Sequence, residues 1–96
     1  MPSYRLAPMA EQDMKAIWEY AYKYSGISQA NDYIDELVSV FEGLAVSSSH
    51  GISCDHLRVA YKFYRQGKHL IYFKTTDYGV AIIRMLHARM LPSLHL

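Results

Sequence analysis

The chain has 96 residues, a length that fits one domain, residues 1–96, and leaves no room for a second hydrophobic core. Hydrophobic residues make up 51% and charged residues 20%, a balance that excludes an intrinsically disordered chain. The formal net charge of +1 argues against a general RNA-binding protein, because such proteins need a large positive charge to meet the phosphates.

The near-neutral total hides two halves of opposite charge. Residues 1–48 contain three basic and seven acidic side chains, whereas residues 49–96 contain seven basic and two acidic ones. All five histidines also fall in the second half. We interpret this division as an acidic N-terminal unit beside a basic C-terminal unit that is available to an acidic partner.

Cysteine content and apolar runs indicate where the protein works. The single cysteine, Cys54, has no partner for an internal disulfide, which is typical of a reducing compartment. The N-terminus lacks the apolar segment of a secretory leader, and no apolar run reaches the length of a membrane span. We therefore expect a cytoplasmic protein that does not enter membranes.

The first half of the chain predicts two helices. Residues 9–24 form the first, since apolar residues recur at helical spacing between Met14 and Ala21. Ser25-Gly26 is expected to end it, and Ser28 is a suitable cap for a second helix whose apolar stripe extends to Leu44. The short connection predicts an antiparallel helical hairpin.

The second half of the chain predicts strands. Residues 59–64, 69–75 and 80–87 have strand character, and turn sequences around Gly67 and Gly79 separate them. The last two segments are apolar on both sides of the pleat, so both faces of the sheet need a cover. Two helices can cover one face, and we expect the C-terminal tail or another protein to shield the other.

These elements define the predicted architecture. Tyr4-Arg5-Leu6 is short and suits an edge strand before the helices. The predicted fold class is α+β, with an N-terminal edge strand and an antiparallel two-helix hairpin packed on one face of a three- to four-stranded antiparallel sheet.

One ordered set of residues covers nearly the whole chain and consists of Tyr4-Arg5-Leu6, Ala10, Asp13-Met14, Ile17-Trp18, Gln29-Ala30, Tyr33, Leu37, Phe41, Leu44-Ala45, Gly51, Cys54-Asp55, Leu57-Arg58, Tyr61-Lys62, Tyr64, Gly67, His69, Ile83-Arg84, Leu86-His87 and Arg89-Met90. With these residues, the order of a helical hairpin and a basic, aromatic-rich meander resembles the RelE/ParE superfamily of bacterial toxins, and the local matches resemble its ParE branch.

The resemblance implies the toxin of a type II toxin-antitoxin pair. ParE-like toxins are held inactive by a cognate antitoxin whose C-terminal segment wraps around them, and several of them poison DNA gyrase and so block replication. The RelE branch instead cleaves mRNA in the ribosome. A third possibility is a non-toxic relic that keeps antitoxin binding.

The two toxic mechanisms need different residues. Cleavage of mRNA needs a general base, a general acid and cations around one phosphate, and Arg58, Arg84, His87 and Arg89 are the candidates for these roles. No dedicated base is evident, and these arginines are better explained as solvated or paired with the acidic hairpin. We therefore predict no catalytic residue and keep a RelE-like endonuclease as the alternative.

A gyrase inhibitor needs a recognition surface, and such surfaces favour Tyr, Trp, Arg and Met. The candidates for contacts with the target are Arg58, Tyr61, Arg84, His87, Arg89 and Met90. The candidates for contacts with the antitoxin are Trp18, Tyr33, Tyr64, Arg65 and Tyr72.

Metal and cofactor sites are not predicted. His50, Cys54 and His56 are zinc-ligand types, but their spacing lacks the paired pattern of a structural zinc site. The expected partners are a cognate antitoxin, either ParD-like or unrelated to ParD, and DNA gyrase. We expect a hetero-oligomer with the antitoxin and no direct sequence-specific contact with nucleic acid.

Overall fold

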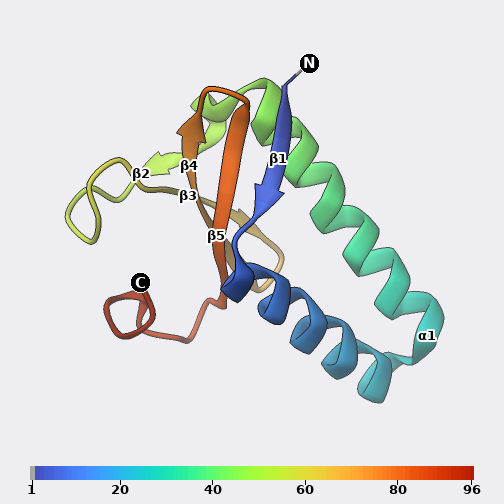
Figure 1. The fold of residues 1–96 in the computed structure, drawn as a ribbon. Coiled ribbons are helices and arrows are strands. Elements are labelled where there is room, and N and C mark those ends of the chain that lie inside the picture. The colour runs from blue at the N-terminus through green and yellow to red at the C-terminus, as the bar shows by residue number, and fades with distance from the viewer. Residues whose placement is uncertain (1) are drawn as a thin grey trace.

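The computed structural model describes residues 2–96 as one bent helix beside a five-stranded sheet (Figure 1). The elements in chain order are β1 (Ser3–Leu6), α1 (Pro8–Val46), the short helix η1 (Ser48–His50), β2 (Ile52–Ser53), β3 (Lys62–Gln66), β4 (His69–Thr76), β5 (Gly79–His87) and the short helix η2 (Pro92–Leu94).

Helix α1 has 39 residues and bends sharply at Gly26, the one residue inside it with non-helical angles (φ 87°, ψ 170°). Its two halves diverge from this bend as two arms (Figure 1). The prediction of two helices joined by a turn is wrong, because one glycine without a Cβ supplies the change of direction and the flanking residues stay helical. Near the bend, the Trp18 indole N–H donates to Asn31 Oδ1 over 2.9 Å and so links the arms.

The sheet is mixed, with the strand order β1-β5-β4-β3-β2. Strand β1 pairs in parallel with β5, and the other neighbours are antiparallel. The predicted three- to four-stranded antiparallel sheet is therefore wrong in both strand number and type. The parallel pair forms because the chain leaves the sheet after β1 and returns through the long helix and three strands, so that β5 runs beside β1 in the same direction.

The start of β3 also differs from the prediction. Val59 and Ala60 lie in a loop before the strand, and Val59 is 85% exposed. The Asp55 carboxylate accepts the Ala60 N–H over 2.8 Å, and Ala60 has a positive φ of 68°. A side-chain hydrogen bond therefore replaces the strand ladder at this point.

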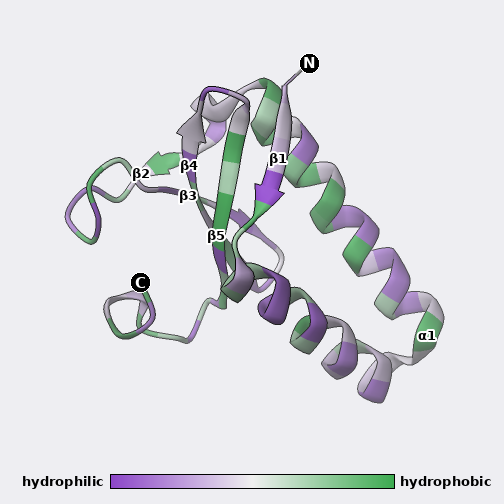
Figure 2. Cartoon of the chain, viewed as in Figure 1, coloured by the Kyte–Doolittle hydropathy of each residue, from purple (hydrophilic) through white to green (hydrophobic). Residues whose placement is uncertain are grey.

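Two hydrophobic clusters lie on opposite faces of the sheet, because side chains alternate along β4 and β5. Ile71 and Phe73 face α1, where they pack with Leu37 and Phe41. The middle of β5 is coloured as hydrophobic in Figure 2.

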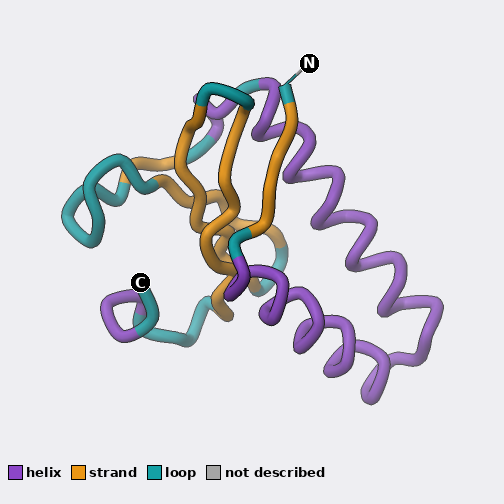
Figure 3. Tube along the Cα trace, viewed as in Figure 1, coloured by secondary structure: helices purple, strands orange, loops and turns teal. Residues whose placement is uncertain are grey.

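The second cluster lies on the face away from α1. It centres on Cys54, Tyr72 and Leu86, and Met90 and Leu96 of the C-terminal tail pack against it. We expected either the C-terminal tail or another protein to shield this face, and the structure places the tail there, with the loop between β2 and β3 adding to the cover (Figure 3).

Gly79 fixes the contact between β1 and β5. Its φ is +139°, and a Cβ at this position would lie 2.0 Å from the Ser3 backbone oxygen. We expect Gly79→Ala to lower the free energy of unfolding by about 2 kcal/mol or more, because it adds both backbone strain and a clash. Chemical denaturation measures this change.

Gly43 provides the control, because nothing lies within 4 Å of a Cβ built there. Gly43→Ala should raise the free energy of unfolding by about 0.5 to 1 kcal/mol, as expected for a helical position. Equal effects of the two substitutions would show that the β1–β5 contact does not depend on Gly79.

Candidate functional site

The best-anchored polar contact of the fold joins α1 to β5. Arg84 Nε lies 2.8 Å from Asp13 Oδ2, and Arg84 Nη2 lies 3.0 Å from Asp13 Oδ1, so the pair is bidentate. Asp13 Oδ2 also accepts the Met85 backbone N–H over 3.0 Å. Strand β1 ends at Leu6, opposite Ile82 of β5. Beyond that point Asp13 takes the place of a neighbouring strand, because it accepts the Met85 N–H at the edge of β5.

This ion pair is largely shielded from solvent, with side-chain exposures of 12% for Arg84 and 14% for Asp13. Hydrogen bonding to Asp13 raises the pKa of Arg84 above its ordinary value. Arg84 was predicted to contact the target, but its guanidinium is occupied inside the fold.

Two of the three predicted arginines, Arg84 and Arg58, each donate one hydrogen bond to the C-terminal tail. Arg84 Nη1 donates to the His95 carbonyl over 3.0 Å, and Arg58 Nη2 donates to the Leu96 carbonyl over 3.2 Å. Tyr61, another predicted target contact, packs against the second hydrophobic cluster. These three residues therefore hold the tail and its cluster together.

The other three predicted target contacts meet in a turn after β5. His87 is the last residue of the strand, and its carbonyl accepts the Met90 N–H over 2.9 Å. His87 Nδ1 accepts the Arg89 N–H over 3.1 Å. The Arg89 side chain is exposed, whereas Met90 is half-buried.

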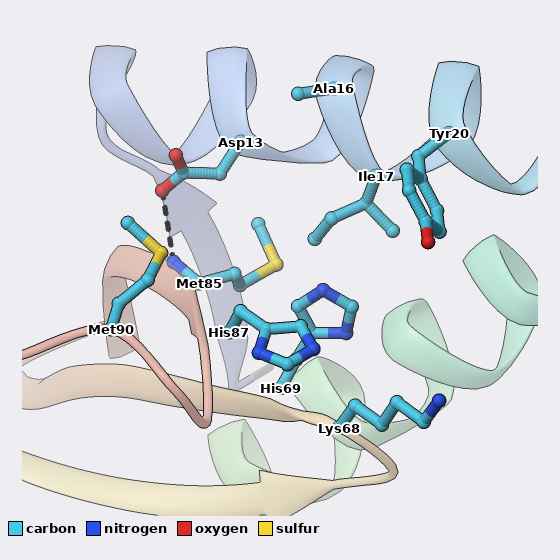
Figure 4. A pocket seen from close by; sticks show the side chains of 9 residues that line it. All are labelled: Asp13, Ala16, Ile17, Tyr20, Lys68, His69, Met85, His87 and Met90. Carbon is cyan, nitrogen blue, oxygen red and sulfur yellow. Dashed lines mark hydrogen bonds between the residues drawn. The ribbon is translucent and has the colours of Figure 1, made fainter.

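A pocket of about 420 Å³ opens beside this turn, between the first arm of α1 and the ends of β4 and β5 (Figure 4). Its lining is mostly apolar and consists of Asp13, Ala16, Ile17, Tyr20, Lys68, His69, Met85, His87 and Met90. His87 and Met90 were predicted from the sequence as site residues, and the pocket shows which surface they share.

The imidazole of His69 is held by a hydrogen bond to Tyr33, which does not line the pocket. His69 Nδ1 lies 2.7 Å from Tyr33 Oη, and Tyr33 Oη also donates to the Gln66 carbonyl over 3.1 Å. Burial, reinforced by His87, lowers the pKa of His69 below its ordinary value of 6.5, so this ring is neutral near pH 7. Burial raises the pKa of Tyr33, which keeps its hydroxyl protonated.

The predicted antitoxin contacts do not form one surface. Trp18 stacks on Tyr22 near the bend of α1, with 5.1 Å between the ring centroids. Arg65 is exposed on β3, where its Nε donates to the Gly67 carbonyl. Tyr72, also predicted as an antitoxin contact, is only 2% exposed, and it lies in the second cluster beneath the loop and the tail.

Tyr64 lies in a second hollow. This groove of about 270 Å³ follows the second arm of α1 and is lined by Ser39, Val40, Gly43, Leu44, His50 and Tyr64. Beside it, β2 pairs with β3 only at Lys62 and Phe63. Among residues 2–96, the outer edge of β3 has no strand partner from Tyr64 to Gln66.

The three residues considered for zinc do not come together as a site. Cys54 is buried, and burial raises the pKa of its thiol, whereas His50 and His56 are exposed. Within the described part of the chain, no three His, Cys, Asp or Glu side chains are grouped to hold a metal ion.

Sequence reasoning gave no functional role to most residues that line the pocket. They include Asp13, Tyr20, Lys68, His69 and Met85. Asp13 and His69 did stand among the residues that carry the family resemblance, and that was the only available signal. Their roles depend on contacts between α1 and the ends of β4 and β5, which no local pattern encodes.

Comparison with known families identifies the chain. The family described as "ParE toxin of type II toxin-antitoxin system, parDE" matches residues 4–92. The chain belongs to the ParE toxin family. The resemblance to the ParE branch is therefore confirmed.

Relatives in two bacteria agree with this assignment. The chain is 34% identical to Toxin ParE1 of Caulobacter vibrioides over 96 residues, which cover 100% of this chain and 99% of the relative. It is 32% identical to Toxin ParE1 of Mycobacterium tuberculosis over 88 residues, which cover 91% and 90% of the two chains.

A solved structure supports the fold. The chain superposes on a chain from the chromosomal ParDE toxin-antitoxin system of P. aeruginosa with a TM-score of 0.75 and 16% identity, covering 91% of this chain and 96% of that one. Among residues 2–96, no helix has both the length and the apolar character needed to cross a membrane.

Proposed function

We propose that this ParE-family chain is a toxin that inhibits DNA gyrase by binding it, and that a cognate ParD-type antitoxin neutralises it in the cytoplasm. The observation that carries the proposal is the match to the ParE toxin family over residues 4–92. The structural neighbour is described as part of a ParDE system, which supports an antitoxin of the ParD type as the partner.

The side-chain contacts favour binding over mRNA cleavage. Two of the cations that a cleavage site would need, Arg58 and Arg84, are hydrogen-bonded to the tail, and Arg84 is also paired with Asp13. A phosphate would have to compete with the Asp13 carboxylate for Arg84. The exposed Arg89 and the adjacent Met90 remain on the surface as recognition residues, of types that are enriched at protein interfaces.

The groove beside Tyr64 is suited to the antitoxin. The open edge of β3 offers backbone donors and acceptors to an added strand, and the neighbouring groove offers an apolar track along the second arm of α1. The exposed Arg65 next to this edge provides a positive charge for an acidic residue of the antitoxin.

The target is tested with purified protein. We expect it to inhibit gyrase supercoiling and to leave a ribosome-programmed mRNA intact. Arg89→Ala should weaken gyrase inhibition by about tenfold, the cost typical of an interface anchor, without changing the unfolding midpoint, because the Arg89 side chain is exposed.

Lys74→Ala is the matched control for Arg89→Ala, since Lys74 is an exposed cation on β4. It should leave inhibition unchanged. Cleavage of mRNA without any effect on gyrase would contradict the proposal. Truncation of the tail is not a clean alternative test, because Met90 and Leu96 cover the second cluster.

The antitoxin groove is tested with Gly43→Arg. A Cβ built at this position meets nothing within 4 Å, and Gly43 lines the groove, so a long side chain there can extend into the groove. We expect it to weaken binding of the cognate antitoxin by about tenfold or more, since it obstructs the apolar track. Isothermal titration calorimetry measures the affinity.

Glu42→Arg is the control for Gly43→Arg, because Glu42 is exposed on the same turn of α1 but does not line the groove. It should keep near-normal affinity for the antitoxin. If Gly43→Arg also binds normally, the antitoxin does not use this groove.

A further inference from the structure

The pocket beside the end of β5 contains two imidazole rings whose hydrogen-bonding roles are fixed from outside the pocket. The centroids of His69 and His87 lie 5.7 Å apart, and the rings meet edge to face at 81°. Both rings lie together on one wall of the pocket (Figure 4). In each ring Nδ1 is occupied, and among residues 2–96 neither Nε2 has a hydrogen-bond partner.

The partner of His69 sets its tautomer. The hydroxyl of Tyr33 has one proton, and the Gln66 carbonyl can only accept it. The 2.7 Å contact between Tyr33 Oη and His69 Nδ1 therefore needs the proton on Nδ1. In this neutral ring, Nε2 carries a lone pair and acts as an acceptor.

The partner of His87 sets the opposite tautomer. Its Nδ1 accepts the Arg89 backbone N–H, so the proton of the neutral ring lies on Nε2. Of the two rings that line the pocket, His69 therefore carries an acceptor at Nε2 and His87 carries a donor at Nε2. A ligand that pairs with both must itself carry one donor and one acceptor.

The other walls favour a flat aromatic ring. Tyr20 lies on α1 at the pocket and is 68% exposed. Its ring packs at a tilt against Tyr24, with 4.6 Å between the ring centroids, so a ligand ring would stack on the part of Tyr20 that faces the pocket. The thioethers of Met85 and Met90 form further walls, and methionine sulfur makes favourable contacts with aromatic rings. The volume of about 420 Å³ falls within the usual range of small-molecule sites.

The charge of the pocket favours an anion. Lys68 contributes an exposed ammonium group. The carboxylate of Asp13 is the one acidic group of the lining, and Arg84 and the Met85 N–H already occupy it. The uncompensated charge among the lining side chains is therefore positive.

We propose that this pocket binds a nucleotide, with the base against Tyr20 and the methionines, the base edge paired with His69 Nε2 and His87 Nε2, and the phosphate beside Lys68. All four bases carry a donor next to an acceptor on one edge. An aliphatic side chain would leave both imidazole nitrogens unpaired, and a simple anion would not use the apolar walls. The inference does not depend on whether gyrase is the target.

The test is a titration of the full chain followed by NMR signals of the two histidine side chains. The probes are AMP, adenosine, inorganic phosphate and a short single-stranded thymidine oligonucleotide. AMP should shift the signals of both rings, and adenosine should do so with an affinity lower by about threefold, because it lacks the charge that meets Lys68.

Two pairs of variants locate the binding. Tyr20→Ala should weaken AMP binding by roughly tenfold, as expected for the loss of a base–aromatic stack. Tyr22→Ala is its control, because Tyr22 is an exposed tyrosine of the same helix that stacks on Trp18 and does not line the pocket. Lys68→Gln should weaken AMP binding by about threefold, and Lys74→Gln should not.

The outcomes separate the possible ligands. If inorganic phosphate alone shifts the signals of both rings as much as AMP does, the proposal is overturned. An absence of shifts with every probe would also overturn it. Loss of binding in Tyr22→Ala as well as in Tyr20→Ala would also overturn it. Tighter binding of the oligonucleotide than of AMP would support it and identify an unpaired strand as the source of the nucleotide, and the reverse would support a free nucleotide.

Discussion

The ion pair between Asp13 and Arg84 connects three parts of the molecule that are distant in sequence. Asp13 belongs to α1 and Arg84 belongs to β5. Nη1 of Arg84 donates to the carbonyl of His95 in the tail. The same carboxylate accepts the Met85 N–H, where β5 no longer has β1 beside it. One charged pair therefore closes the sheet edge, fixes the helix and holds the tail.

The two hollows of the structure lie in different places on the molecule. The turn at His87, Arg89 and Met90, in which Arg89 is exposed, lies with the adjoining pocket at one end of β5. The groove at Tyr64 lies along the other arm of α1, next to the open edge of β3. Because α1 bends at Gly26, its two arms lie beside two different hollows of this short chain.

Sequence patterns predicted the elements better than their contacts. Strand alternation predicted β4 and β5 closely, since their periodicity is local, and the family resemblance came from ordered residue types. The continuity of α1 was not predicted, because Ser25-Gly26 is typical of a helix end. In the structure the positive φ of Gly26 bends the helix without ending it. The sequence did not predict that Arg84 pairs with Asp13, because the two residues lie 71 positions apart. It also did not predict that Tyr72 is buried, because the local strand pattern does not show which segment covers that face of the sheet.

Asp13 and Arg84 are expected to stabilise the fold as a coupled pair, and a double-mutant cycle in the free energy of unfolding tests this coupling most directly. The cycle compares Asp13→Ala, Arg84→Ala and the double variant by chemical denaturation. We expect the sum of the losses in the two single variants to exceed the loss in the double variant by at least about 1 kcal/mol, which is the coupling typical of contacting charged residues. Additive losses would show that the two residues act independently and would contradict this account.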